Sequence, residues 1–277
     1  MLFRSEHALL VRAAGEGVGA YLAAGDAPGV VPPASDPYAI AVGGTTLGIG
    51  QAGNRLFETG WSTGWLTLDQ GKWVNGGPQG PSGGGAGGGP SVSWKQPWYQ
   101  RGVVPAALSH STGLAGVFRS VPDISADADP ATAMAVGVLS VQPGSAPQFS
   151  LTPVGGTSLA TPLVAGMVAA AQQGSTVPFG FLNPVLYKLA GTSALHDALP
   201  VTASTPSLFR GTSCDPATCG AQTLTVFDDQ SASLPSYTGQ VTLKGYDNMT
   251  GLGTPAGQQF ITALRALESG AAPGLLP

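Results

Sequence analysis

The sequence has 277 residues, of which 43% are hydrophobic and only 9% are charged. This composition is too apolar for a disordered protein, and the chain lacks the charged heptads of a coiled coil. Eleven basic and 15 acidic residues give a net charge of −4 without a basic run, which argues against nucleic-acid binding, and no window of about 18 apolar residues predicts a membrane span. The length suffices for one sizeable domain or at most two small ones. The low content of Lys and Arg also fits a protein that works in acid.

The first predicted elements are one helix and two short apolar strands. Residues 6–16 (EHALLVRAAGE) have an amphipathic helical pattern, which Gly17 ends. Strands are predicted at 18–24 and 38–42. Short apolar runs joined by long connections indicate a parallel sheet with helices on its faces.

The middle of the chain contains a run of Gly, Pro and Ser at 75–90 (NGGPQGPSGGGAGGGP). This run is either a flexible linker between domains or a surface loop within one domain. After it, the sequence predicts a strand at 123–126, a hairpin of 135–141 with 149–154, and helices at 158–173, 184–190 and 255–268.

The two cysteines, Cys214 and Cys219, lie in the polar segment SCDPATC. Two thiols without a nearby His do not make a zinc site. They are either free thiols or a small loop-closing disulfide of an exported protein. We favour the disulfide because the segment is polar and its exposure is expected.

The strongest chemical signal is the segment GGTSLATPLVAG at 155–166. Two glycines end a predicted strand and allow a tight turn, so that Ser158 stands at the start of a helix. The positive end of the helix would stabilise negative charge that develops at a nucleophile there. Pro162 is expected in the first helical turn, where its missing N–H is not needed. Taken alone, the pattern fits equally well an ordinary core helix with Ser158 as its N-cap.

The same segment resembles the nucleophile segment shared by subtilases and sedolisins, the serine-carboxyl peptidases. The three histidine segments (SEHAL, LSHST and ALHDA) do not resemble the HGTH of subtilases. Asp26, in AAGDAPG, stands where subtilases have Asn and sedolisins have Asp. Further segments resemble sedolisin motifs in the same order: PASDPY, VGGT, ETGW, GGG with QPWYQ, VPDISADADP, NPVLY, and GYD with TGLGTP.

The resemblance to the sedolisin family implies an α/β fold with a subtilisin-like parallel central sheet flanked by helices. Residues 1–277 would form the C-terminal part of a catalytic domain, lacking its N-terminal portion. Ser158 would be the nucleophile and Asp26 the oxyanion-hole residue. Because a charged carboxylate would repel an oxyanion, Asp26 can donate only when protonated, which predicts activity in acid. The alternative is that Asp26 merely forms a turn.

The resemblance also implies one Ca²⁺ site, within a region at 195–255. Its ligands would be two side chains and three backbone carbonyls: those of Asp197 and Asp247, and those of Ala198, Leu243 and Gly245. Hard oxygen donors of this kind suit Ca²⁺. The alternative is that both aspartates are turn residues.

The family's general base, a Glu followed four residues later by an Asp, has no match in this sequence. The residues four positions after Glu6, Glu16, Glu58 and Glu268 are Leu10, Ala20, Ser62 and Ala272. We therefore expect an upstream or separate segment to supply this pair as a partner, and the 277 residues alone to be inactive. The start of the chain does not resemble a signal peptide, although the resemblance implies a secreted enzyme.

Three hypotheses follow from the sequence. The first is a serine endopeptidase that cleaves protein or peptide substrates in acid, of which this chain is a part. The second is a subtilase-type peptidase, which would need a HGTH segment and Asn in place of Asp26. The third is a catalytically inactive remnant or binding domain of a sedolisin-like protein.

Overall fold

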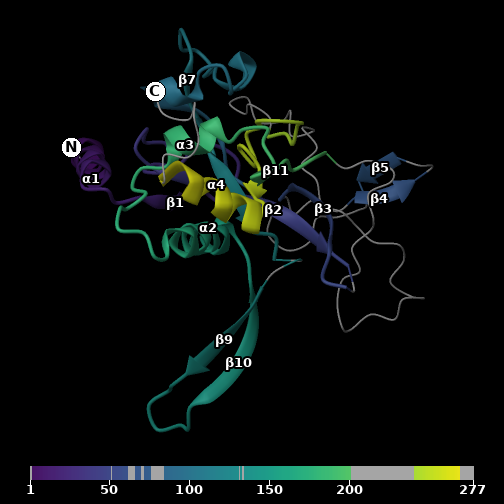
Figure 1. Ribbon diagram of the computed structural model, residues 1–277. Coiled ribbons are helices and arrows are strands. Elements are labelled where there is room, and N and C mark those ends of the chain that lie inside the picture. Colours follow the sequence, from purple (N-terminus) through teal and green to yellow (C-terminus); the bar gives the residue numbers. More distant parts are fainter. Residues whose placement is uncertain are drawn as a thin grey trace.

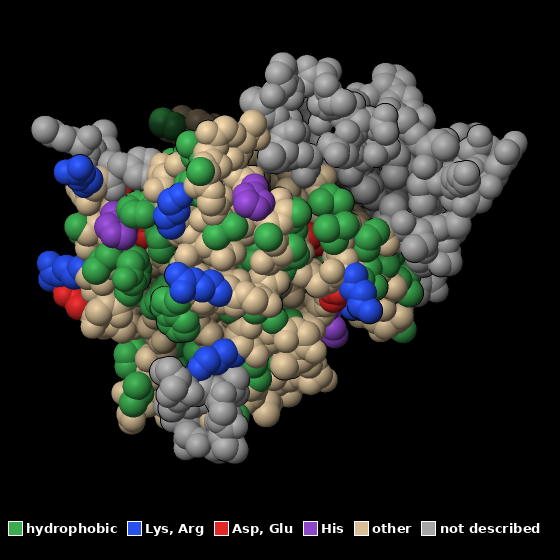
Figure 2. All heavy atoms as spheres, turned by 90° about the horizontal axis from the view of Figure 1, so that it is seen from above, with side chains coloured by type: hydrophobic (Ala, Val, Ile, Leu, Met, Phe, Trp, Pro, Cys, Tyr) green, Lys and Arg blue, Asp and Glu red, His purple; other side chains and the backbone are tan. Residues whose placement is uncertain are grey.

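The computed structural model describes residues 2–50, 52–61, 66–69, 72–75, 84–130, 132, 134–200 and 240–268. Both cysteines and residues 76–83 of the predicted linker or loop lie outside the described residues. No helix within these ranges is long and apolar enough to cross a membrane. On the face shown in Figure 2, the Lys and Arg side chains of the described residues lie apart from one another.

The helices are α1 (Leu2–Gly15), α2 (Thr157–Gln172), α3 (Asn183–Lys188) and α4 (Gln258–Glu268), and short 3₁₀ turns lie at Trp98–Gln100 and Ala106–Leu108. The strands are β1 (Tyr21–Ala23), β2 (Ile40–Ile49), β3 (Arg55–Gly60), β4 (Leu66–Asp69), β5 (Lys72–Asn75), β6 (Gly89–Lys95), β7 (Phe118–Val121), β8 (Ile124–Asp127), β9 (Met134–Ser140), β10 (Gln148–Val154), β11 (Leu195–His196) and β12 (Thr254–Pro255).

The central sheet is built around β2. Strands β1 and β8 both pair with β2 in parallel, with Tyr21 opposite Ile40 and Val42 opposite Ile124. Strand β3 pairs with β2 in the antiparallel sense, and this strand was not predicted. The first seven residues of β2 are buried, as expected for a strand that is covered on both faces. The predicted parallel sheet is therefore confirmed.

Helix α2 packs against β1, β2 and β8, and α4 packs against α2 (Figure 1). Val164 and Val168 of α2 meet Phe260 and Leu264 of α4 in one buried core. The predicted last helix begins at Gln258 rather than at Pro255, because Thr254 and Pro255 form β12 and pair with β11.

Helix α2 begins at Thr157, with Gly156 as its N-cap, and Pro162 lies five residues further on. The prediction that Pro162 falls in the first turn is therefore wrong. Since proline has no N–H, the carbonyl of Ser158 has no intrahelical hydrogen bond from that position. The helix nevertheless continues to Gln172, because its apolar face packs on the sheet.

The predicted hairpin is present as β9 and β10, paired from Met134 opposite Val154 to Ser140 opposite Gln148. It extends away from the rest of the molecule in Figure 1. Six of its large apolar side chains are between 38% and 68% exposed, and they are Met134, Val136, Val138, Leu139, Phe149 and Leu151.

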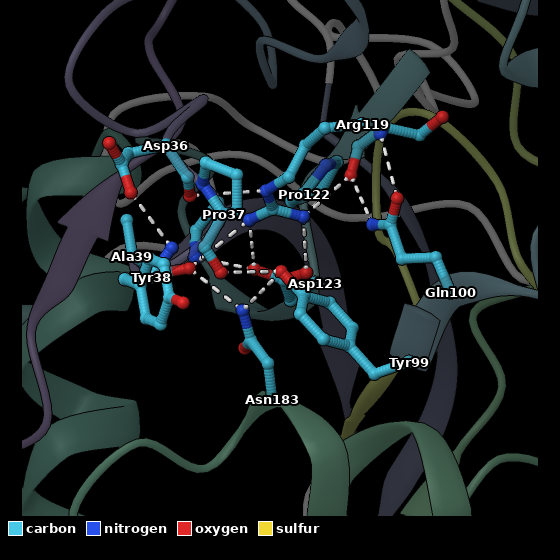
Figure 3. A network of polar contacts seen from close by, with 12 residues as sticks. Asp36, Pro37, Tyr38, Ala39, Tyr99, Gln100, Arg119, Pro122, Asp123 and Asn183 are labelled. Atoms are coloured by element: carbon cyan, nitrogen blue, oxygen red, sulfur yellow. Dashed lines mark hydrogen bonds and ion pairs between the residues drawn. The ribbon is translucent and has the colours of Figure 1, made fainter. Parts of the chain in front are cut away.

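A buried ion pair fixes the segment between β7 and β8 (Figure 3). Nη1 and Nη2 of Arg119 donate to Oδ1 and Oδ2 of Asp123 at 2.7 and 2.6 Å. Arg119 also donates to the carbonyls of Asp36 and Ala39, and the N–H of Ala41 donates to Asp123. Burial alone would lower the pKa of Arg119, but Asp123 raises this pKa well above its ordinary value, so Arg119 stays charged. The network thereby positions the start of β2 beside β8.

Candidate active site

Three segments meet where α2 begins, at the carboxyl ends of β1 and β8. The turn after β1 carries Asp26, whose backbone carbonyl accepts a hydrogen bond from the N–H of Gly85 at 3.0 Å. The residues directly before α2 lie beside the end of β8 in space, because the N–H of Gly156 donates to the carbonyl of Ala128 at 2.6 Å. This edge of a parallel sheet is where α/β proteins commonly bind ligands.

The carboxyl group of Asp26 caps helix α2 from a distant part of the chain. Its Oδ1 accepts the backbone N–H and the hydroxyl of Thr157, each at 2.7 Å. Gly156 has φ +87°, and a Cβ there would lie 2.6 Å from Oδ2 of Asp26. Only glycine therefore allows this close approach. Asp26 is more than a local turn residue, because its side chain contacts a helix 131 residues further along the chain.

Ser158 is the second residue of α2, and it is exposed, whereas Thr157 and Leu159 on either side are buried. The helix is not capped by Ser158: Gly156 is the N-cap and the Asp26 carboxyl accepts the first N–H. The alternative of Ser158 as an N-cap is therefore wrong. The hydroxyl stands on the exposed side of the positive end of α2. The structure thus brings Asp26 and Ser158 to the same helix end.

No His, Asp or Glu side chain of the described residues forms a hydrogen bond with Ser158. His7 of α1 pairs with Asp36 at 2.7 Å and stacks on Trp94. His110 contacts the carbonyl of Gly116 at 3.1 Å, and His196 belongs to β11. The histidines therefore do not form a Ser–His pair in this part of the structure.

Buried carboxyl groups at the same edge of the sheet were not predicted as site residues. Asp127 ends β8, and burial raises its pKa to about 7, although the hydrogen bond from Thr132 opposes this rise. Asp129 and Glu58 raise the same pKa through like charge. In the sequence Asp127 is simply one letter of VPDISADADP, and no spacing reveals that it is buried.

The predicted calcium ligands lie in two adjacent loops. The N–H of Gly245 donates to Oδ2 of Asp197 at 2.9 Å, and Gly245 itself has φ +82°. Oδ1 of Asp197 is buried without a hydrogen-bond partner. An orphaned carboxylate oxygen of this kind fits a cation. Ala198 is buried directly after it, and Leu243 is 39% exposed.

Asp247 has a different environment from Asp197. Its two oxygens accept four hydrogen bonds, from the N–H groups of Leu243, Met249 and Thr250 and from the hydroxyl of Thr250. Burial raises the pKa of Asp247 to about 7, against the effect of these hydrogen bonds. Four donors occupy the usual acceptor sites of a carboxylate. Asp247 therefore shapes its own loop, and could bind a metal only by giving up a donor.

Within the described part of the chain, no group of three or more His, Cys, Asp or Glu side chains could hold a metal ion. The residues above would thus depend on backbone carbonyls for most of a coordination shell. The structure brings Asp197 and Gly245 together, and Leu243 and Asp247 together.

Residues 3–183 match the model of the subtilase family. The chain is 31% identical over 242 residues to kumamolisin from Bacillus sp. (strain MN-32), covering 87% of this chain and 33% of kumamolisin. It is 34% identical over 167 residues to sedolisin from Pseudomonas sp. (strain 101), and 35% identical over 175 residues to xanthomonalisin from Xanthomonas sp. (strain T-22). Each of these matches covers 60% of this chain, with 23% of sedolisin and 17% of xanthomonalisin. The chain thus spans a third or less of these relatives.

The fold is also similar to the solved structure of Pseudomonas sedolisin, a serine-carboxyl proteinase complexed with two molecules of pseudo-iodotyrostatin. The TM-score is 0.61 with 27% sequence identity, and the match covers 95% of this chain and 60% of that chain.

Proposed function

Because the chain belongs to the subtilase family and its relatives are sedolisins, we propose that it is part of a serine endopeptidase that acts in acid, with Ser158 as nucleophile. The observation that carries the proposal is the exposed Ser158 at the N-terminus of α2, one residue beyond the hydrogen bonds that Thr157 makes to Asp26. The substrate class is protein or peptide.

In the proposed reaction, Oγ of Ser158 attacks the carbonyl carbon of the scissile peptide bond. The new C–O bond forms as the carbonyl electrons move to oxygen, and a base takes the serine proton. When the tetrahedral intermediate collapses, the C–N bond breaks and the amine leaves with a proton. Water then hydrolyses the ester on Ser158 and restores the hydroxyl.

Asp26 would stabilise the oxyanion of the tetrahedral intermediate. Its Oδ1 is already an acceptor for Thr157, which leaves Oδ2 to carry a proton and donate it. The ionised group has no proton to donate and would repel the oxyanion. We therefore expect acylation of Ser158 to fall as the pH rises.

We propose that the general base is a Glu oriented by an Asp and supplied by a segment outside these 277 residues. No Glu of the sequence is followed four residues later by Asp. A hydroxyl without a base is a weak nucleophile, so among acyl donors the chain alone would react only with activated ones such as a p-nitrophenyl ester. Secretion and the Cys214–Cys219 disulfide stay predictions.

We also propose one Ca²⁺ ion at the loops of residues 197–198 and 243–247. The side chains of Asp197 and Asp247 and the carbonyls of Ala198, Leu243 and Gly245 would hold it. The orphaned Oδ1 of Asp197 supports this assignment. When bound, the ion would supply electrostatic cross-linking of the two loops and would take no part in peptide-bond cleavage.

The test is acylation of the chain by a peptide p-nitrophenyl ester between pH 3 and 7, with the modified residue mapped by mass spectrometry. We expect one acyl group on Ser158, with less product as the pH rises. Ser158→Ala should abolish it, while the matched change of exposed Ser193→Ala should not. Absence of acylation at every pH, or equal acylation of the Ser158→Ala variant, would favour the inactive remnant or binding domain.

A further inference from the structure

The hydroxyl of Thr157 is fully engaged within the protein. The side chain is buried, with 0% exposed surface, although Ser158 next to it is exposed. Its Oγ1 donates to Oδ1 of Asp26 at 2.7 Å and accepts the N–H of Gly25 at 3.2 Å. Since a hydroxyl has a single proton, Thr157 has none left to offer a substrate.

The two oxygens of Asp26 are not equivalent. Oδ1 accepts two hydrogen bonds from Thr157, whereas Oδ2 accepts none from the described residues. Oδ2 lies against Gly156, whose missing Cβ would be 2.6 Å away. In a protonated carboxyl group, the carbonyl oxygen is the better acceptor and the other oxygen carries the proton. Two donors directed at Oδ1 therefore favour the proton on Oδ2.

From these contacts we propose that Thr157 is a positioning residue, which keeps the proton of Asp26 on Oδ2. This inference rests on the proposed function, because it concerns the same oxyanion site. Without the hydroxyl, Oδ1 would keep only the backbone N–H of Thr157 as a donor. The carboxyl group could then turn about Cβ–Cγ and carry its proton on either oxygen.

Thr157 also holds the backbone that carries Asp26. Gly25 has φ +115°, a conformation that L side chains rarely adopt, and its N–H has the Thr157 hydroxyl as acceptor. Loss of this acceptor would leave the N–H unpaired in a partly buried place. One hydroxyl therefore contacts both the carboxyl group of Asp26 and the turn that carries it.

Two variants separate the hydroxyl of Thr157 from its methyl group. The methyl group lies close to Gly44 of β2: a Cβ built on Gly44 would be 3.5 Å from it. Thr157→Val keeps the branched shape and removes the hydroxyl. Thr157→Ser keeps the hydroxyl and removes the methyl group.

The experiment measures affinity for a peptide aldehyde at acidic pH, using the full 277-residue chain. Oγ of Ser158 adds to the aldehyde carbon, and the carbonyl oxygen takes up the serine proton, so that a hemiacetal forms without a leaving group. The matching peptide alcohol, which cannot react, reports ordinary peptide binding. The preference for aldehyde over alcohol therefore reports stabilisation of the tetrahedral adduct.

We expect Thr157→Val to lower the aldehyde preference about 10- to 100-fold, since removal of an oxyanion donor itself costs roughly 10²–10³-fold. Affinity for the alcohol should not change. Thr157→Ser should stay within about threefold of the wild type, and both variants should melt cooperatively by circular dichroism.

Two results would overturn the inference alone: an unchanged aldehyde preference in Thr157→Val, or equal losses in the Val and Ser variants, which would indicate packing by the methyl group. A third result would overturn the proposed function as well as this inference. If the wild type shows no aldehyde preference and Ser158→Ala makes no difference, the proposed nucleophile fails and the role of Thr157 fails with it.

Discussion

Asp26 and Thr157 stand 131 residues apart in the sequence, yet Oδ1 of Asp26 accepts both donors of Thr157 at 2.7 Å. This contact joins the turn after β1 to the first residue of α2. The same contact caps the helix that presents Ser158. Formation of the candidate site is therefore coupled to long-range folding, since neither segment completes it alone.

Gly156→Ala tests the close approach of Asp26 to α2. The substitution strains a backbone at φ +87° and inserts a Cβ 2.6 Å from Oδ2 of Asp26. We expect loss of acylation at Ser158 and a free energy of unfolding lower by about 1–3 kcal/mol, as is usual for strain at such positions. Urea unfolding and ester labelling measure the two effects.

The control is Gly174→Ala, at φ +84° and with no heavy atom within 4 Å of the added Cβ. It carries similar backbone strain without the clash. Labelling at the wild-type level is expected for this variant. Equal labelling of both variants would contradict the need for glycine beside Asp26.

The buried pair of Arg119 and Asp123 is expected to dominate stability among the ion pairs described. Both side chains have 0% exposed surface, and removing one partner leaves an uncompensated charge. Arg119→Met should lower the free energy of unfolding by roughly 3–5 kcal/mol, as measured by urea. Arg12→Met is the control, because Arg12 and Glu16 have the same i, i+4 spacing on the surface, where a loss of less than about 1 kcal/mol is expected. Equal losses of unfolding free energy in the two variants would contradict the expectation that the buried ion pair contributes more to stability than the surface pair.

Local patterns in the sequence predicted several of the helices and strands. The apolar alternation around Pro143 and Gly144 predicted the hairpin, and the small apolar residues after Ser158 predicted α2. Strand β3 was missed although it pairs with the preceding strand β2, because its residues RLFETG do not alternate strictly between apolar and polar side chains. The last helix was predicted too early because pairing of Thr254 with His196 overrides its helical pattern.

In the candidate site too, local motifs could be predicted from the sequence, whereas contacts between distant segments could not. The Ser158 segment and the Asp26 turn each have a local motif, and the structure brings them to one helix end. The role of Thr157 depends on a contact between distant segments, so no local pattern could indicate it. Likewise, the sequence predicts Asp197 and Asp247 equally as calcium ligands. In the structure, one oxygen of Asp197 is buried without a hydrogen-bond partner, whereas Asp247 accepts hydrogen bonds from its own loop.

The raised pKa of Asp127 predicts that the free energy of unfolding decreases from acid to neutral pH. Burial raises its pKa from 3.8 to about 7, so between those values the folded protein holds a proton that the unfolded chain has lost. The free energy of unfolding therefore falls as pH rises through this window, by on the order of 4 kcal/mol for this group. Melting temperatures between pH 3.5 and 8 measure the effect.

Asp127→Asn should make this pH profile less steep, and the slope that remains is expected from Asp247, because burial also raises the pKa of Asp247 to about 7. The amide stays neutral, and its oxygen can still accept the hydroxyl of Thr132, which donates to Asp127 at 2.7 Å. We expect the variant to match the wild type near pH 4 and to exceed it near pH 8. A variant with an unchanged pH dependence would show that another group causes it.

The β9–β10 hairpin is expected to limit solubility. Leu139 and Phe149 form a cross-strand pair with 63% and 68% exposed surface, and no charged residue lies between Asp129 and Lys188. Exposed edges of this kind invite association. Phe149→Lys should raise the concentration at which light scattering detects aggregates, without lowering the melting temperature. Leu9→Lys, at an isolated site with 65% exposed surface, is the control and should have a smaller effect. Equal gains would show that net charge, rather than the hairpin, limits solubility.

Asp197 and Asp247 are expected to respond differently to Ca²⁺. Asp197 has one orphaned buried oxygen, so excess Ca²⁺ should raise the melting temperature of the wild type above its value in EDTA, and Asp197→Asn should remove that rise.

Asp247 accepts three backbone N–H groups and one hydroxyl, and the amide of Asp247→Asn would direct its own N–H groups at some of these donors. This variant should therefore melt at a lower temperature both in Ca²⁺ and in EDTA, since its loop is damaged in either case. If Asp197→Asn kept the full response to Ca²⁺, any ion would bind elsewhere. If Asp247→Asn lost stability only in Ca²⁺, Asp247 would act mainly as a metal ligand, and the four donors would not be what shapes its loop.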